Sequence, residues 1–448
     1  MATPRRTPAD LLSMTPTDME LHRVVAATPA MTAGADDARA RSARRFILQL
    51  ARALHQHGTP AHRLEAALST AARRLGLQAE FFSTPTSIMV GIGALEEQQV
   101  HLLRVEPGEP NLGQLNALGA ITRDVVDGVI TPDEGLRRID ALDAEPPTYP
   151  TWLVVVAFVL SSAAVACFLK VRTGDVATAS VLGLLAGAIA ILAGRWESTR
   201  HVTEPLAAFV VTAVAFLADA VLHTRSGYAT SLAGLVVLFP GLTFTIALTE
   251  LSTRHLASGT ARLSGALVTF LGLGFGLALG AKAGAWAGAG LSDSLPQLAG
   301  LLSRAELPVW AEWAGLIVAP LAFTVLLNGP PRDAPLIVLA CAVAYLTSKY
   351  AGAAMGEELG AFLGALVVTA GSNVLARLRR RVAMVTQVPG LLILVPGSIG
   401  FRSVRSLLDQ QVEAGIATGF RVAIVGISLA AGMLAGNVVT RAMNRVRR

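Results

Sequence analysis

The chain has 448 residues, of which 53% are hydrophobic and 15% are charged, and its mean hydropathy is +0.55. Soluble domains carry about 25% charged residues, so this composition excludes an ordinary soluble enzyme and predicts a mainly α-helical membrane protein. The net charge of +6 is also compatible with nucleic-acid binding. However, the arginines cluster beside apolar stretches, as the positive-inside rule requires. We therefore expect membrane lipids, and no nucleic acid, as partners.

The N-terminal part of the chain is polar. Residues 1–37 are rich in Ala, Thr and Pro and lack the apolar core of a secretory signal, so we expect a disordered leader. Residues 38–146 predict a small cytoplasmic α+β domain, joined to the membrane part by a linker over 147–151. Its expected helices are 40–57, 60–75, 112–126 and one after the capping box Thr131-Pro132-Asp133-Glu134, and its expected strands are 78–83, 86–91 and 100–105. Thr59 is the expected N-cap of the second helix, with Pro60 as its first residue.

About ten apolar stretches follow, and most have the roughly 20 residues that a spanning helix needs. They predict two membrane repeats of five helices, residues 152–290 and 309–440, before a basic cytoplasmic tail at 441–448. Val382–Ile399 contains Pro389 and Pro396, so we do not expect it to be one straight helix. The stretches are Trp152–Leu169, Val176–Gly194, Pro205–Leu222, Ala229–Leu248, Leu263–Ala281, Val309–Leu327, Pro335–Leu346, Leu359–Leu375, Val382–Ile399 and Ile416–Val439.

The distribution of basic residues predicts the orientation. Arginines are more frequent in the loops that lie on the same side as the N-terminal domain, and the largest cluster is Arg377, Arg379, Arg380 and Arg381. This moderate bias places both termini in the cytoplasm. We expect a multi-pass protein of a bacterial cell (inner) membrane.

One phrase occurs in both predicted repeats. Gly234–Gly241 reads GLVVLFPG, and Gly390–Gly397 reads GLLILVPG 156 positions later. Because about five spans separate the two copies, we expect them to face opposite ways, as in transporters built from inverted repeats. A second match, Val210–Ala213 with Val367–Ala370, lies one position out of register, and chance similarity between apolar helices also explains it.

The Pro-Gly pairs predict where the membrane helices break. Proline removes a backbone donor and glycine weakens the helix, and the freed polar groups are tolerated in a membrane only in a wet cavity or against a ligand. The expected substrate site therefore lies between the broken fourth and ninth spans, although a simple kink without a ligand is an alternative. Its candidate residues are Pro240, Gly241, Pro396, Gly397 and Ser398, with Ser372 and Asn373 of span eight as uncharged hydrogen-bonding groups.

Two carboxylates near the spans are candidates for proton coupling. Asp219 lies near the end of the third span and Glu250 lies ten residues after Pro240. Ionisable groups at membrane depth are often functional, but each of these has a structural alternative. Asp219 could pair with His223 or Arg225, and Glu250 could form a salt bridge with Arg254.

The sequence resembles the threonine/serine exporter family. The N-terminal domain carries Gly58-Thr59-Pro60-Ala61-His62-Arg63-Leu64-Glu65, similar to the family's Gly-x-x-x-x-Arg-x-Glu helix entry, and Pro85-Thr86-Ser87-Ile88, similar to its Pro-Thr strand turn. Leu394–Gly400, which overlaps the second phrase, resembles the family's second membrane half. The resemblance implies secondary active export of small hydroxylated amino acids by alternating access, driven by an ion gradient.

Other functions stay open at this stage. Relatives in the family carry other small metabolites, such as dicarboxylates. A sensor or enzyme acting through the N-terminal domain, or a channel, is a further alternative. No nucleophile elbow, phosphate loop or metal-ligand spacing supports an enzyme, so we expect none and no cofactor or metal. A homo-oligomer is compatible with the glycine-rich helices.

Overall fold

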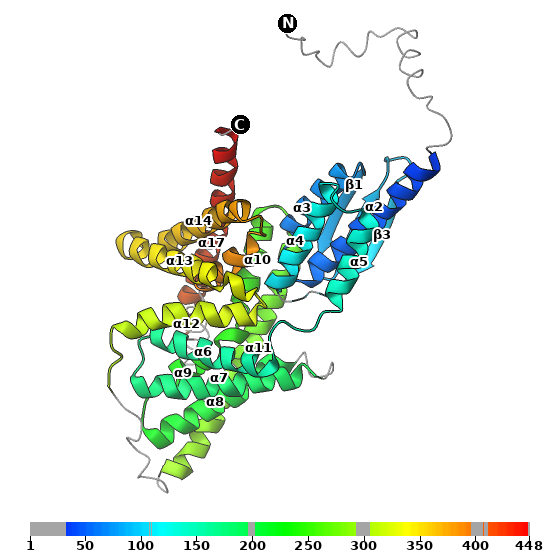
Figure 1. Cartoon of the computed structure of the whole chain (residues 1–448). Coiled ribbons are helices and arrows are strands. Elements are labelled where there is room, and N and C mark those ends of the chain that lie inside the picture. Colours follow the sequence, from blue (N-terminus) through cyan, green and yellow to red (C-terminus); the bar gives the residue numbers. More distant parts are fainter. Residues whose placement is uncertain are drawn as a thin grey trace.

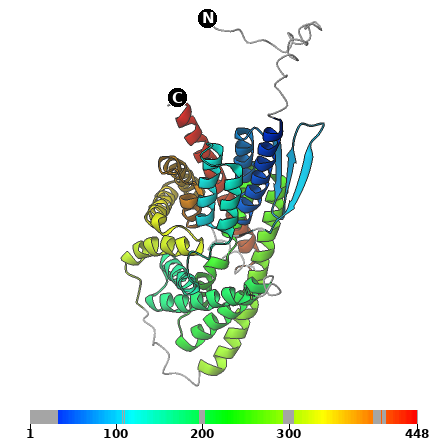
Figure 2. The ribbon, with the colours of Figure 1, turned by 45° about the vertical axis from the view of Figure 1, so that its right-hand side comes forward.

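The structure is a computed structural model that describes residues 33–106, 108, 110–195, 202–292, 305–395, 406 and 411–446. It consists of helices and one small sheet (Figure 1). The described N-terminal residues form a separate layer at one end of a larger helical part, and they lie beside the C-terminal half of that part (Figure 2).

The described N-terminal unit contains four helices and a three-stranded antiparallel sheet in the order β1-β2-β3. Apolar residues at helical spacing on α2, α3, α4 and α5 meet the buried side of β2, and fully buried Phe46, Leu64, Ile88, Leu118 and Ile139 form the core. Thr131 accepts the expected capping bond from the Glu134 amide at 3.3 Å. The elements are α2 (Ala33–Gln56), α3 (Ala61–Arg74), β1 (Ala79–Thr84), β2 (Ser87–Ile92), β3 (Gln99–Arg104), α4 (Leu112–Val126) and α5 (Pro132–Asp143).

The rest of the described chain is helical and apolar. Within it, seven helices are long and apolar enough to cross a membrane, and one bent helix pair makes an eighth candidate span. This is the architecture of a multi-pass membrane protein. The first half contains α6 (Thr151–Phe168), α7 (Thr173–Ala193), α8 (Thr203–Leu222), α9 (Gly227–Leu235), η4 (Val236–Leu238), α10 (Gly241–Ser252) and α11 (Leu256–Ser292). The second contains α12 (Trp310–Leu326), η6 (Pro331–Asp333), α13 (Ala334–Met355), α14 (Glu357–Leu378), α15 (Met384–Leu392) and α17 (Val412–Val446).

The predicted spans differ from these helices mainly in length. The stretch expected to end at Leu346 continues as α13 to Met355, and α11 has 37 residues, many more than the predicted Leu263–Ala281. The fourth span divides, because α9 with η4 and α10 meet at an angle of 58°. Val382–Ile399 yields the short helix α15, which contains Pro389.

Glycines allow close helix packing at matching positions in the two halves. A Cβ on Gly276 of α11 would lie less than 3.0 Å from the carbonyl oxygen of Pro205 on α8. A Cβ on Gly432 of α17, 156 positions later, would lie equally close to the carbonyl oxygen of Phe362 on α14. Small residues permit such backbone contacts in membranes. One turn further, Gly280 packs on Phe209 and Gly436 on Leu366.

The short helices α9 and α15 also correspond. Each has nine residues, and α15 begins 157 positions after α9. Their starts lie in different surroundings, since Met384 of α15 packs against Leu112 and Leu115 of the N-terminal unit, whereas α9 lies on the far side of the membrane part (Figure 1). The two short helices therefore lie in different parts of the molecule.

Candidate functional site

The two Pro-Gly phrases meet inside the helical part. Pro240, with φ −79° and ψ 37°, separates η4 from α10, and buried Gly241 begins α10. A Cβ on Gly241 would lie less than 3.0 Å from Cγ1 of Val395, a residue of the second phrase. Glycine therefore permits a close approach that alanine would obstruct. The predicted site residues Pro396, Gly397 and Ser398 lie outside the described residues.

The two polar residues predicted on span eight point to different neighbours. Buried Ser372 accepts a hydrogen bond from the Thr386 hydroxyl at 2.9 Å, which ties α14 to α15. The Asn373 amide instead donates to Oδ1 of Asn437 at 2.8 Å and to the Thr440 hydroxyl at 3.2 Å, on α17. Of this pair, Ser372 is bonded to α15 and Asn373 to α17.

The carboxylate of Asp219 organises the turn between α8 and α9. Its Oδ1 accepts the Thr224 hydroxyl at 2.7 Å and the Ser226 amide at 2.9 Å. Asp219 thus holds the entry into the first broken span by bonds to uncharged groups. The sequence had suggested an ion pair with His223 or Arg225 as an alternative, but the bonds of Asp219 go to Thr224 and Ser226 instead.

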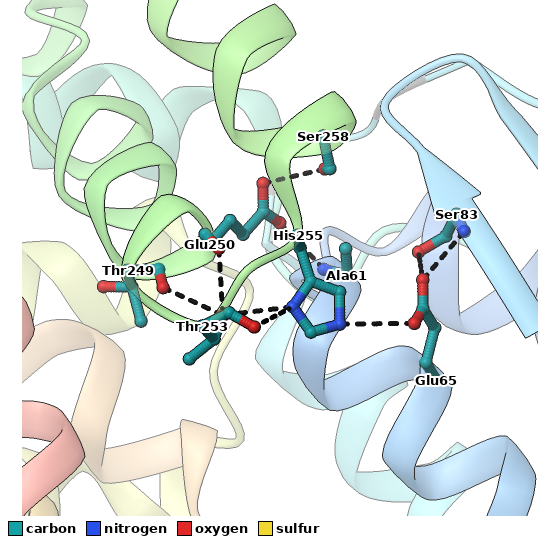
Figure 3. A network of polar contacts seen from close by, with 8 residues as sticks. All are labelled: Ala61, Glu65, Ser83, Thr249, Glu250, Thr253, His255 and Ser258. Atoms are coloured by element: carbon teal, nitrogen blue, oxygen red, sulfur yellow. Dashed lines mark hydrogen bonds and ion pairs between the residues drawn. The ribbon is translucent and has the colours of Figure 1, made fainter.

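Glu250 is fully buried near the end of α10, where it contacts the N-terminal unit (Figure 3). Its Oε1 accepts the backbone N–H of Ala61 at 2.8 Å. Its Oε2 accepts the Ser258 hydroxyl at 2.7 Å and forms an ion pair with Nε of Arg262 at 3.2 Å. The charge is therefore compensated by Arg262, and the alternative considered from the sequence, a salt bridge with Arg254, is wrong.

The contact of Ala61 with Glu250 changes how α3 begins. The sequence predicted Thr59 as its N-cap, but the cap position is Pro60, which makes no side-chain cap bond. The hydroxyl of Thr59 is buried without a hydrogen-bond partner among the described residues. Glu250 satisfies the first free N–H of α3 and adds negative charge at the positive end of the helix dipole. The cap thus comes from the membrane part.

Glu65, one turn further along α3, makes a second contact with the first half (Figure 3). Its Oε1 accepts both the amide and the hydroxyl of Ser83 at 2.8 Å, which fixes the carboxylate against β1. Its Oε2 lies 3.2 Å from Nε2 of His255, in the turn between α10 and α11. Glu65 therefore links the small sheet to the end of the first broken span.

Arg63, on the same helix, reaches the second half. Its guanidinium donates to the side-chain oxygen of Gln387 on α15, and the Gln387 amide donates to Thr369 on α14 at 3.1 Å. Burial lowers the pKa of Arg63 to about 10, so it remains charged at neutral pH. The helix α3 thus contacts α15 and the end of the first broken span through two residues of the Gly-x-x-x-x-Arg-x-Glu motif.

Apolar packing and two backbone hydrogen bonds complete the junction, the contact surface between the N-terminal unit and the membrane part. Leu112 and Leu115 of α4 pack against Met384 and Val388 of α15, with Leu242 of α10 beside them. The amides of Leu112 and Gly113 donate to the carbonyls of Leu327 and Asn328 after α12, each at 2.9 Å. The beginnings of α3 and α4 are thus both capped by the membrane part.

A neutral histidine occupies the same interface. His62 directly precedes Arg63 on α3, and its ring centroid is 6.2 Å from that of His255. Burial, together with the nearby positive charge of Arg63, lowers the pKa of His62 to about 3. His62 is therefore uncharged at neutral pH, and protonating it would place a further cation in this junction.

Two family models match the sequence of this chain. The ThrE family model, a threonine/serine exporter, matches residues 45–283, and the model described as "Threonine/Serine exporter, ThrE" matches residues 312–439. The chain belongs to the threonine/serine exporter family. The two matches cover the N-terminal unit with the first membrane half, and then the second membrane half.

Fungal proteins are among the relatives of this family member. It is 29% identical to "Pheromone-regulated membrane protein 10" of Saccharomyces cerevisiae, over 83% of the chain and 48% of the relative. The protein of the same name from Eremothecium gossypii is 26% identical, over 85% of the chain and 51% of the relative. The chain thus spans about half the length of these curated relatives. No solved structure matches it.

Sequence reasoning did not identify the partners in this exporter-family junction. The motif residues Arg63 and Glu65 were visible as a family signature, but their contacts Gln387 and His255 were not. Arg63 and Gln387 are 324 positions apart, and no local pattern relates them. Gln387 inside an apolar stretch was the one available signal, because an amide in a membrane helix needs a partner.

Proposed function

We propose that the protein is a secondary active exporter of small amino acids of the threonine/serine type, coupled to protons and working by alternating access. The observation that carries this proposal is the close approach of Gly241, at the break before α10, to Val395 of the second Pro-Gly phrase. Interrupted membrane helices expose amides and carbonyls to a solute, and they form substrate sites in transporters of this construction. Family membership favours an amino-acid substrate. We place its carboxylate near free amides and its ammonium near free carbonyls at these breaks, with Ser372 nearby.

We also propose that the two halves have opposite orientations, an arrangement that would allow alternating access. The first broken span ends at the N-terminal unit, where Glu250 caps α3. The corresponding span of the second half begins there, where α15 packs on α4. Two halves of this kind could rock about a central site and expose it to each side in turn. We therefore retain the inverted five-helix repeats as part of the proposal.

For proton coupling we propose Asp219 first and Glu250 second. Asp219 is bonded to uncharged donors, so its protonation breaks no ion pair in the described structure. Protonation of Glu250 would weaken its ion pair with Arg262 and its cap on α3. In our proposal this second event would loosen the N-terminal unit, which gives that unit a gating role.

Efflux from proteoliposomes tests this function. Vesicles loaded with labelled threonine or serine should release it faster under an imposed pH gradient, and dicarboxylate-loaded vesicles test the alternative substrate class. Asp219→Asn and Glu250→Gln should reduce the gradient-driven component, whereas exposed Glu357→Gln serves as a matched control. If both variants keep full gradient-driven efflux, the proton assignment is wrong. Conductance independent of any gradient would instead indicate a channel.

We also propose that the N-terminal unit and both termini lie in the cytoplasm. The basic residues around the junction, including Arg377 and Arg381, support this orientation through the positive-inside rule. The curated relatives compared above are fungal, so they do not support a bacterial inner membrane. That location remains a prediction from the sequence alone. Cysteine labelling of intact cells at an exposed N-terminal position tests the orientation, because external labelling would contradict it.

A further inference from the structure

A basic cavity lies where the N-terminal unit meets the second membrane half. Its volume is about 620 Å³, within the range of about 300–1,000 Å³ that small-molecule sites occupy. None of its described lining residues is acidic. The positive residues that line it are Arg63 and Arg123 from the N-terminal unit and Arg377, Arg380, Arg381 and Arg441 from the second membrane half.

Some of these arginines have protein partners, but two do not. Arg63 donates to Gln387, and Arg381 forms an ion pair with Asp333. Arg123 donates to the backbone carbonyl of Arg380 at 2.8 Å and so helps to hold that residue in its left-handed conformation, with φ 51°. Within the described part of the chain, the guanidinium groups of Arg380 and Arg441 make no ion pair or hydrogen bond. Positive groups gathered in this way repel one another unless an anion joins them.

The uncharged lining residues are suited to the same kind of ligand. Asn373 and Asn437, with the hydroxyl of Thr440, form a connected polar group at the cavity. His62 also lines the cavity, and its Nδ1 is buried without a hydrogen-bond partner among the described residues. The described lining includes none of Gly241, Val395 and Ser372, around which we place the transported amino acid. The cavity is therefore distinct from the proposed amino-acid site.

The helices beside the cavity also expose apolar side chains. Leu378 at the end of α14 is 75% exposed, and Val438 and Met443 on α17 are 63% and 50% exposed. A ligand with a phosphate headgroup in the cavity could lay its acyl chains on this surface. Basic pockets between membrane helices on the cytoplasmic side bind anionic lipid headgroups in this way.

We propose that this cavity binds phosphate groups of a multiply charged anion, supplied by an anionic membrane lipid or by a soluble phosphate compound. Planar guanidinium groups match phosphate oxygens in pairs. A phosphate here bridges Arg123 of the N-terminal unit to Arg380 and Arg441 of the second membrane half. It thereby stabilises the docked position of the unit. This site goes beyond the proposed transport function and does not depend on the identity of the transported substrate.

Binding to the purified full-length protein in neutral detergent tests the proposal. Thermal stability and native mass spectra are measured with cardiolipin, with phosphatidylcholine and with inorganic pyrophosphate. We expect saturable stabilisation by cardiolipin or by pyrophosphate, but not by phosphatidylcholine. Stabilisation by cardiolipin alone identifies a lipid ligand, and stabilisation by pyrophosphate identifies a soluble one. If neither stabilises the protein, the proposal is wrong.

Variants separate this site from general charge effects. Arg380→Gln and Arg441→Gln should each weaken binding about tenfold, since a hydrogen bond to a charged group contributes about 1.5 kcal/mol or more. Arg379→Gln is the matched control, because this exposed neighbour does not line the cavity. Equal weakening by Arg379→Gln would overturn the proposal. The two test residues lie on different elements, so a folding defect in one variant leaves the other as the test.

Discussion

The backbone N–H of Ala61 donates to Oε1 of Glu250 at 2.8 Å, across 189 positions of sequence. This bond joins the first turn of α3 to the end of the first broken membrane span. Because the same carboxylate pairs with Arg262, a single buried group links the N-terminal unit, α10 and α11. Small changes at this group should therefore affect the whole junction.

Loss of the Glu250 charge should destabilise the protein. Glu250→Gln leaves Arg262 without its buried partner, and breaking such a pair costs about 3–5 kcal/mol. We expect a lower melting temperature in detergent and faster proteolysis between residues 144 and 151. Arg262→Gln should have a similar effect, and the double variant should cost less than the two single variants together. Additive effects would show that the two residues do not interact.

Acid should weaken the junction through His62. Its pKa is about 3 in the folded protein, whereas the ordinary value of 6.5 applies to the unfolded chain. Between pH 3 and pH 6.5, the unfolded chain therefore binds a proton at His62 that the folded protein does not bind. Stability therefore falls as the pH decreases from about 6.5 toward 3, by roughly 1 kcal/mol per pH unit. Melting curves between pH 7 and pH 5 measure this slope.

The His62→Gln variant isolates this contribution. It removes the titrating group, so the variant should lose less stability than the unchanged protein between pH 7 and pH 5. His101→Gln, a half-buried position on β3, is the control and should keep the original slope. His55, whose pKa is also lowered by burial, contributes part of the remaining slope in all three proteins. Equal slopes in all three would contradict the role of His62.

The glycine contacts predict equivalent behaviour of the two halves. Gly276→Ala and Gly432→Ala each place a methyl group against a backbone carbonyl, that of Pro205 or of Phe362. Overpacking of this kind costs about 1–3 kcal/mol, and we expect similar losses of thermal stability. Gly371→Ala is the control, because its added Cβ would meet no atom within 4 Å. A loss confined to one half would argue against the structural repeat.

How far the sequence could predict this molecule depends on the range of the interactions. Hydrophobic length and the Pro-Gly phrase predicted most helices and the break at Pro240, because both depend on neighbouring residues. The capping of α4 by Asn111 and of α5 by Thr131 is local as well. The cap of α3 was assigned to Thr59 because local rules name the nearest hydroxyl. The true acceptor, Glu250, lies in another part of the fold.

The same limit applies to the candidate site. Pro240 and Gly241 were identified from the repeated Pro-Gly phrase, and their neighbour Val395 belongs to the second copy of that phrase. Asn373 was expected near the substrate together with Ser372, because both are uncharged hydrogen-bonding groups inside span eight. Adjacent residues on a helix point about 100° apart, so Ser372 contacts α15 while Asn373 contacts α17. Only the packing of three helices decides which residue meets the broken span.

The contact between Gly241 and Val395 gives the most direct test of the transport proposal. Gly241→Ala forces apart the two interrupted helices, since the new methyl group would collide with Cγ1 of Val395. We expect threonine or serine efflux to fall strongly while the protein still reaches the membrane. Val395→Ala removes the obstructing atom, so the double variant should regain much of the lost efflux. Gly265→Ala on α11 has free space around its added Cβ and should transport normally. If Gly241→Ala transports as well as Gly265→Ala, close approach of the two phrases is not needed for export.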